Sequence, residues 1–167
     1  MKTIYLAGGC FWGTQKFFDQ FSAVVETEVG YANGNTESPT YQEVCYHNTG
    51  HAETVRVVYD ETRLPTQKLL EYYFLTIDPL AVNHQGGDFG TQYRTGIYFT
   101  DPSLEPDIRA AVAHEVWNVG HNLAVEVEPL RNFYPAEESH QKYLEKRPYG
   151  YCHIRPELFR LEEEEST

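Results

Sequence analysis

The spacing of apolar residues along the chain predicts an alternation of strands and helices. Residues 3–7 form a short apolar run typical of a strand. A helix follows, with Phe17, Phe18 and Phe21 on one side, and residues 24–31 read as a second strand. The N-terminal part of the chain is therefore predicted to be strand, helix, strand.

The middle of the chain continues this pattern. Thr40 and Glu43 fit a capping box, which predicts a short helix carrying Val44 and Cys45. A strand is predicted over 54–59. A longer helix is predicted from about Thr66, with apolar residues at helical spacing up to its end before Asp78 and Pro79: Leu69, Leu70, Tyr73, Phe74 and Ile77.

The second half begins with a polar, glycine-rich stretch, 83–93, which is predicted to be one long loop of the kind that is often functional. Beyond it we predict a strand at 95–100, a helix at 108–119, a strand at 123–127, and mainly short helix and coil from Arg131 onward. The predicted fold class is α+β. It is a single domain over 1–167 with a mixed sheet flanked by helices and a coil-rich C-terminal segment that wraps back over it.

Composition narrows the classes of partner. The net charge is −12 and no basic stretch offsets it, so binding to nucleic acid or to an anionic membrane surface is not expected. Part of this acidity lies in the run of glutamates after Leu161, and the tail at about 162–167 is predicted to be frayed and solvated.

The three cysteines, Cys10, Cys45 and Cys152, are odd in number and widely spaced, unlike a disulfide-stapled secreted scaffold. The chain opens directly into a strand without a signal peptide, and no apolar run approaches the roughly 20 residues that span a bilayer. We therefore expect a cytoplasmic protein, in which cysteines tend to be catalytic or redox-active.

Cys10 is the strongest candidate for chemistry because it lies at a turn from strand to helix. The free backbone N–H groups and the dipole at a helix start favour the thiolate. Phe11 and Trp12 supply two aromatic surfaces beside the sulfur, on which an apolar part of a substrate can rest. The common alternative for such a cysteine is a small buried core residue.

Glu53, at the entry to the strand at 54–59, is a second candidate. Edge charges of this kind usually have no special function. A glutamate pointing into an aromatic pocket instead keeps its proton near neutrality and can act as a general acid. Tyr41 and Tyr93 stand next to polar turn residues, so their hydroxyls can point into the same site.

Two other kinds of site have weak support. His114 and Glu115 resemble the start of a zinc-protease helix, but Asn118 occupies the place of the second histidine. No phosphate-binding or dinucleotide-binding pattern is present, so neither a metal nor a cofactor is expected. Cys152 lies in an aromatic turn rich in glycine and proline, where it is either a packed cysteine or a resolving thiol for a sulfenic acid at Cys10.

Eight motifs resemble, in order, those of the A-type peptide methionine sulfoxide reductases. They are Gly9-Cys10-Phe11-Trp12-Gly13, Gly30-Tyr31-Ala32, Pro39-Thr40-Tyr41, Glu43-Val44-Cys45, Gly50-His51-Ala52-Glu53, Gln85-Gly86-Gly87-Asp88, Gly90-Thr91-Gln92-Tyr93-Arg94 and Phe133-Tyr134-Pro135-Ala136-Glu137. The resemblance covers nearly the whole chain. It implies reduction of methionine sulfoxide, free or in proteins and S at sulfur, with thioredoxin as reductant.

The resemblance also implies a role for each matching residue. Cys10 is the nucleophile, Glu53 protonates the sulfoxide oxygen, and Tyr41 and Tyr93 hydrogen-bond to that oxygen. Phe11 and Trp12 hold the S-methyl group, Asp88 polarises the pocket, Cys152 is the resolving cysteine and Cys45 is not catalytic. Ser139 departs from the usual tyrosine. No cysteine follows Cys152, so a relay to a distal pair is not available.

Two hypotheses from other classes compete with this one. A cysteine–histidine hydrolase would use Cys10 with His51 and would need an oxyanion hole but no second thiol. A module that binds oxidised or apolar peptides would bind without turnover and would not depend on Cys10.

Overall fold

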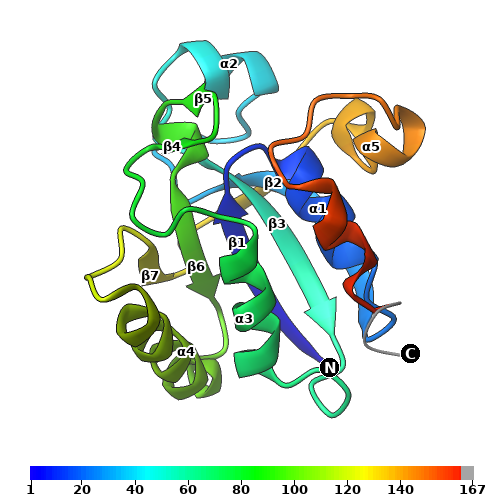
Figure 1. Cartoon of the computed structure of the whole chain (residues 1–167). Coiled ribbons are helices and arrows are strands. Elements are labelled where there is room, and N and C mark those ends of the chain that lie inside the picture. The colour runs from blue at the N-terminus through cyan, green and yellow to red at the C-terminus, as the bar shows by residue number, and fades with distance from the viewer. Residues whose placement is uncertain (163–167) are drawn as a thin grey trace.

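A six-stranded mixed sheet forms the centre of the computed structural model, which describes residues 1–162 (Figure 1). The strand order is β7-β6-β1-β3-β2-β8. The strands are β1 (Lys2–Gly8), β2 (Val24–Ala32), β3 (Ala52–Tyr59), β6 (Thr95–Phe99), β7 (Glu126–Pro129) and β8 (Phe133–Pro135). Only β6 and β7 are parallel, so the predicted mixed sheet is confirmed.

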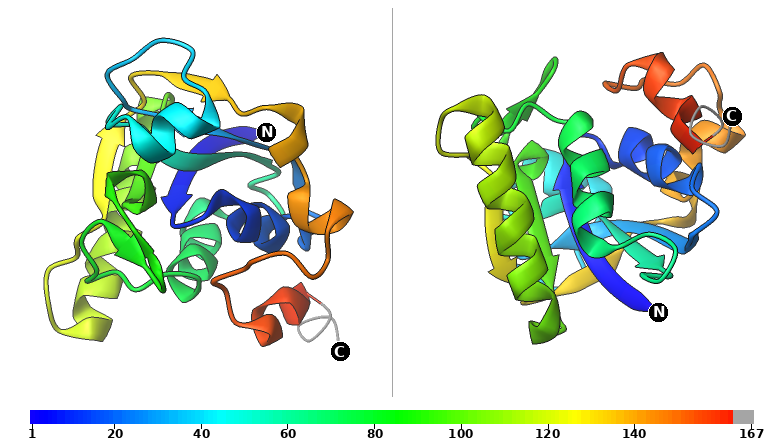
Figure 2. Two further views of the ribbon diagram at one scale, coloured as in Figure 1. Left: turned by 90° about the horizontal axis from the view of Figure 1, so that it is seen from above. Right: turned by 60° about the horizontal axis from the view of Figure 1, so that its bottom comes forward.

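The longer helices cover one face of this sheet (Figures 1 and 2). They are α1 (Phe11–Asp19), α3 (Thr66–Leu75) and α4 (Glu105–Val119); the short helices are α2 (Tyr41–Tyr46) and α5 (Tyr143–Lys146). The alternation along β1 explains the layering, because Ile4 and Leu6 pack in the main core with the helices while Ala7 joins a small cluster on the opposite face. Among the described residues, no helix is long and apolar enough to cross a membrane.

The register of the central strands brings the two main candidate residues together. β1 is hydrogen-bonded on both sides, to β3 and to β6, and Ala7 lies opposite Thr54. The antiparallel pairing therefore places the start of β3, with Glu53, beside the end of β1 and the turn that carries Cys10.

The C-terminal segment wraps back over α1, as predicted (Figure 2). The side chain of Gln15 accepts a hydrogen bond from the backbone N–H of Lys142 at 2.8 Å. Gln20 in turn donates to the carbonyl of Leu158 at 2.8 Å and accepts from the backbone N–H of Leu161. These bonds fix a segment that has little regular structure apart from α5 and the 3-10 turns η3 (Glu138–His140) and η4 (Pro156–Arg160).

The acidic tail is anchored where it begins. The carboxylate of Glu162 accepts hydrogen bonds from the backbone N–H and the hydroxyl of Ser22, the latter at 2.6 Å. The predicted fraying therefore does not include Glu162, and the remainder of the predicted segment, 163–167, lies outside the described residues.

Three elements differ from those predicted from the sequence. The strand expected at 123–127 forms later, as β7, because its parallel pairing with β6 sets Gly96 opposite Glu126. The loop at 83–93 contains a short hairpin whose strands, β4 (His84–Gln85) and β5 (Asp88–Phe89), have two residues each. It also contains the 3-10 turn η1 (Thr91–Tyr93). β8 adds an edge strand that only pairing with β2 defines.

Candidate active site

Cys10 lies at the N-cap position of α1, immediately after β1, as predicted. Its side chain is buried, with 5% of its surface exposed. Burial raises its pKa well above the usual value, the carboxyls of Glu53 and Asp88 add to this, and the backbone N–H of Trp12 opposes it. The expectation that the helix start favours the thiolate is thus wrong for the substrate-free protein, because burial and nearby carboxyls outweigh one N–H group.

Glu53 is buried beside the first turn of α1. One carboxyl oxygen accepts a hydrogen bond from the backbone N–H of Phe11 at 3.1 Å, and the other has no partner among the described residues. Burial raises the pKa of Glu53 to about 8. The carboxyl therefore keeps its proton at neutral pH, and its unpartnered oxygen can donate it.

Tyr41 and Tyr93 face the same space as Glu53. Tyr41 begins α2, and Tyr93 ends η1. The pKa of each is raised, first by burial and next by the carboxyl of Glu53. Cys45, on α2, lies beside both: burial raises its pKa, and hydrogen bonds from the two tyrosine hydroxyls oppose that rise. In Figure 1, one end of the sheet carries the start of α1, the helix α2 and the β4–β5 hairpin.

Aromatic rings form the wall of the site next to Cys10. The ring of His140 lies 5.8 Å from that of Phe11 and 4.3 Å from that of Tyr41. The indole N–H of Trp12 donates to His140 Nδ1 at 3.1 Å, and Trp12 stacks on Tyr143 at 3.9 Å between ring centroids. Burial lowers the pKa of His140, which favours the neutral ring that this bond requires.

Glu137 ties this wall to the sheet. One of its carboxylate oxygens accepts a hydrogen bond from the hydroxyl of Tyr31, on β2, at 3.0 Å. The other accepts from the backbone N–H of Tyr41 at 3.1 Å. The Thr40–Glu43 capping box is present as predicted, so α2 is fixed at its start by two acidic side chains.

Asp88 lies on the β4–β5 hairpin above Cys10. One of its carboxylate oxygens is buried without a partner among the described residues. The carboxylate affects neighbouring groups: it raises the pKa of Cys10, and after burial it is the next cause that raises the pKa of Tyr151 to about 12. Asp88 therefore lies near Cys10 and Tyr151.

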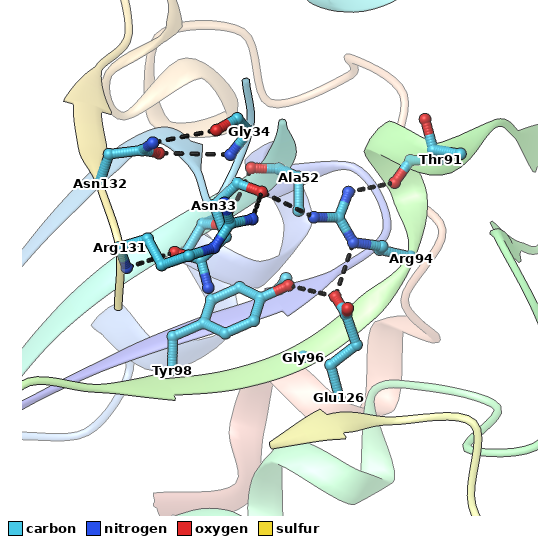
Figure 3. A network of polar contacts seen from close by, with 12 residues as sticks. Asn33, Gly34, Ala52, Thr91, Arg94, Gly96, Tyr98, Glu126, Arg131 and Asn132 are labelled. Atoms are coloured by element: carbon cyan, nitrogen blue, oxygen red, sulfur yellow. Dashed lines mark hydrogen bonds and ion pairs between the residues drawn. The ribbon is translucent and has the colours of Figure 1, made fainter. Parts of the chain in front are cut away.

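Arg94 fastens the turn that carries Tyr93 to the end of the sheet (Figure 3). Its guanidinium donates to the carbonyl of Thr91 at 3.0 Å, to that of Asn33 at 3.3 Å, and to the carboxylate of Glu126 at 2.6 Å. The hydroxyl of Tyr98 donates to the same Glu126 oxygen at 2.7 Å. Three separate segments are thereby joined behind η1.

Arg131 and Asn132 complete this network on the far side of Asn33. Arg131 donates from its guanidinium to the Asn33 carbonyl at 2.6 Å and from its backbone to the Asn33 side chain at 2.7 Å. Asn132 exchanges two hydrogen bonds with the backbone of Gly34. The loop after β2 is therefore held rigidly against the segment between β7 and β8.

Cys152 is half-buried against the first turn of α1. A methyl group built on Gly13 would lie 3.0 Å from Cys152 Sγ, so a side chain at this position would displace the thiol. The three cysteines are free, and the thiol of Cys152 makes only a long contact of 3.8 Å to the carbonyl of Ile154. The structure thus packs Cys152 against the first turn of α1, the helix turn that follows Cys10.

His51 takes no part in this arrangement. Its Nε2 lies 2.8 Å from the carbonyl of Thr36, and its ring packs edge-on against Tyr134. A cysteine–histidine pair of Cys10 with His51 therefore has no support from the geometry. Within residues 1–162, no three side chains of the types that bind metals are grouped to hold an ion.

Comparison with known proteins decides the family. The family model described as peptide methionine sulfoxide reductase matches residues 2–167. The chain belongs to the peptide methionine sulfoxide reductase family. Peptide methionine sulfoxide reductase MsrA of Lachnoclostridium phytofermentans is 54% identical over 153 residues, covering 92% of each chain.

Solved structures agree with this family and with the fold. Mxr1 from Saccharomyces cerevisiae in its reduced form has a TM-score of 0.86 at 37% identity, covering 91% of this chain and 88% of that one. The same yeast protein in complex with Trx2 has a TM-score of 0.61 at 22% identity, covering 92% and 86%. The chain is accordingly an enzyme of the MsrA type, a peptide-methionine (S)-S-oxide reductase.

The structure brings the residues that the sequence nominated close to one another around the start of α1. Nothing in the sequence indicated that His140, Tyr143, Glu137 and Arg94 contribute to the site. The first three come from the segment expected to be mainly short helix and coil. Glu137 and Arg94 belong to two of the matched motifs, but the charge of Arg94 alone gave no sign that it closes a network behind Tyr93.

Proposed function

We propose that this chain reduces the S epimer of methionine sulfoxide, free or in proteins, to methionine through a sulfenic acid at Cys10. The observation that carries the proposal is Glu53: a buried carboxyl with a pKa of about 8 and one unpartnered oxygen, beside a buried thiol. A sulfoxide oxygen is a poor leaving group unless it is protonated as it departs. A neutral acid next to a sulfur nucleophile is the pair of groups that this reaction needs.

The first step balances within the site. Cys10 sulfur attacks the substrate sulfur, Glu53 gives its proton to the sulfoxide oxygen, and that oxygen is transferred to Cys10. Glu53 regains the proton that the thiol loses. The products are methionine and a Cys10 sulfenic acid, so the substrate sulfur gains two electrons and Cys10 sulfur loses two.

The walls of the pocket account for selection of one epimer. Phe11 and Trp12 offer an apolar surface for the S-methyl group, while Tyr41, Tyr93 and Glu53 offer donors for the oxygen. With both groups fixed, only one face of the chiral sulfur is turned toward Cys10. We assign the S epimer because the chain belongs to the A-type family.

Recycling of the enzyme uses Cys152. Its thiol attacks the Cys10 sulfenic acid, a disulfide forms and water leaves. A dithiol protein then reduces the disulfide, and thioredoxin is the proposed reductant, because the yeast relative has been crystallised with Trx2. The three free cysteines fit a reducing compartment, and we place the protein in the cytoplasm.

Separate assays of the two sulfoxide epimers test the proposal. Consumption of NADPH with thioredoxin and thioredoxin reductase is expected with the S epimer alone, and Cys10→Ser should abolish it. Equal rates on the two epimers, or turnover by Cys10→Ser, would overturn it. One equivalent of substrate should leave a disulfide and no acyl adduct, which excludes a hydrolase; binding without turnover would favour a peptide-binding module.

A further inference from the structure

The imidazole of His153 lies against the turn that carries Cys10. A methyl group built on Gly9 would lie 3.1 Å from His153 Nε2. One built on Gly13 would lie 3.5 Å from His153 Nδ1 and 3.0 Å from Cys152 Sγ. Gly9 and Gly13 flank the nucleophile in the sequence, so the ring spans its turn, with the thiol of Cys152 near its Nδ1 side.

Gly9 has a backbone φ of +84°, where a side chain would be strained, and a methyl group there would also come within 2.8 Å of the side chain of Gln85. The ring of His153 therefore lies so close to the backbone next to Cys10 that a side chain at residue 9 would crowd it. These two glycines and the histidine form one packed unit beneath the nucleophile.

Both ring nitrogens of His153 are shielded from solvent, and among residues 1–162 neither makes a well-formed hydrogen bond, although the backbone of Gly8 lies close enough to raise the pKa of the ring. Buried polar atoms usually have partners, and an exception calls for an explanation such as a catalytic role. The mechanism of methionine formation leaves His153 unused, because Glu53 supplies the proton for that step.

Several titratable groups surround the ring. Burial lowers the pKa of His153, while the carboxylate of Asp88 and the carbonyl of Gly8 oppose that shift. Cys152, the preceding residue, is a further titratable neighbour, and the charge of Lys16 lowers the pKa of its thiol. The ring is therefore neutral at physiological pH and can accept a proton.

We propose that His153 transfers the proton in disulfide formation between Cys10 and Cys152. The imidazole takes the proton of the Cys152 thiol as Cys152 sulfur bonds to Cys10 sulfur. The S–O bond of the sulfenic acid breaks, and the imidazolium returns the proton to the departing hydroxide, so that water leaves. The two thiol sulfurs share the oxidation already made at Cys10, and no further oxidant is required.

Two features of Cys152 create the need for such a group. Burial raises its pKa, so little of it is thiolate at neutral pH. Hydroxide is also a poor leaving group without a proton. Because His153 follows Cys152 directly in the chain, the ring stays with the thiol if the segment moves toward Cys10. This inference rests on the proposed resolving function of Cys152.

A single-turnover experiment with His153→Gln, His153→Asn and wild type tests the inference. The reduced enzyme is mixed with one equivalent of methionine sulfoxide, quenched at intervals and analysed for methionine, for sulfenic acid trapped by dimedone, and for the Cys10–Cys152 disulfide. The series is repeated between pH 6 and 9. His121→Gln, an exposed histidine after α4, is the matched control.

Both His153 variants should form methionine at the wild-type rate, which also reports a folded site, and should then accumulate sulfenic acid. Their disulfide step should be 10- to 100-fold slower at pH 7 and should recover as pH rises and Cys152 ionises. His121→Gln should behave as wild type. An unchanged disulfide rate, or a slowing that is equal at every pH, would overturn the inference. If wild type itself forms no disulfide, the proposed function of Cys152 fails instead.

Discussion

The two thiols of the proposed reaction occupy contrasting parts of the molecule. Cys10 follows β1, a strand bonded on both sides, and begins a helix that packs across the sheet. Cys152 lies in a segment without regular structure, held by packing on Gly13 and by a long contact to Ile154. The proposed nucleophile is thus supported by the sheet, and the proposed resolving thiol lies in a segment without regular structure.

This contrast extends to the surrounding groups. Around Cys10, the carboxyl of Glu53 and the tyrosines are positioned by strands, caps and the Arg94 network. Cys152 packs against the hydrophobic core, and its thiol makes a long contact to the carbonyl of Ile154. Rigid support suits a transition state with several partners, whereas a thiol with few polar contacts can make the movement that the proposed disulfide exchange requires. We call the surroundings of Cys10 the sheet side and those of Cys152 the coil side. Substitutions on these two sides should therefore slow different steps of the proposed reaction.

The largest effect is expected on the sheet side, from Glu53→Gln. The variant keeps the shape of the side chain but cannot give up a proton, so formation of methionine in a single turnover should slow by about 10²–10⁴-fold. In wild type, kcat/KM should decline above pH about 8 as Glu53 ionises. A normal single-turnover rate in Glu53→Gln would remove Glu53 from the reaction.

The same variant should be more stable than wild type. The pKa of Glu53 is raised from 4.5 to about 8 on folding, so its stabilising contribution is complete below about 4.5 and is lost as pH rises to about 8. At pH 8, Glu53→Gln should gain roughly 1–3 kcal/mol in the free energy of unfolding. Urea titrations at pH 5 and pH 8 measure this, and an equal difference at both would contradict it.

On the coil side, Cys152→Ser should spare the first step. About one equivalent of methionine should form at the normal rate, after which Cys10 remains a sulfenic acid because no other thiol resolves it. Cycling with thioredoxin should fall by about 100-fold or more, and a small thiol should restore part of it. Cys45→Ser is the control. A Cys10–Cys45 disulfide in wild type, or full activity of Cys152→Ser with thioredoxin, would move the resolving function elsewhere.

A smaller effect is expected from each oxygen-binding tyrosine. Tyr41→Phe and Tyr93→Phe should each slow methionine formation by about 10-fold, since each removes one donor to the substrate oxygen. If both donors bind the same oxygen, their joint loss should exceed either single loss and depart from additivity. Single-turnover rates of the four proteins decide this. Strict additivity would place the two hydroxyls on different groups.

The smallest effect should come from behind the site, at Arg94. Lysine cannot reach the carbonyls of Thr91 and Asn33 and the carboxylate of Glu126 together, so Arg94→Lys should loosen η1 and slow methionine formation a few-fold. Arg109→Lys, at an exposed pair, is the control. The effect of Arg94→Lys should vanish in a Tyr93→Phe background. A full effect in that background would show that Arg94 does not act through Tyr93.

Much of the sheet side follows from local sequence. The helical spacing of Phe17, Phe18 and Phe21, the alternation in β3 and the Thr40–Glu43 box each specify an element without help from the rest of the chain. The ordered motifs then identified Cys10, Glu53, Tyr41, Tyr93 and Asp88. Their encounter in one pocket follows from antiparallel register, since Ala7 opposite Thr54 sets Glu53 beside Cys10.

Only the tertiary structure shows how the pKa of Cys10 is shifted and how the C-terminal segment packs around the site. The helix start suggested a thiolate at Cys10, but burial, with 5% of its surface exposed, raises the pKa of this thiol well above its usual value. No local pattern marks β8, the stacking of Trp12 on Tyr143, or the place of the His153 ring against Gly9 and Gly13. Such contacts join residues more than a hundred positions apart. Local sequence fixes backbone preference over a few residues, whereas burial and partners depend on what the folded chain brings alongside.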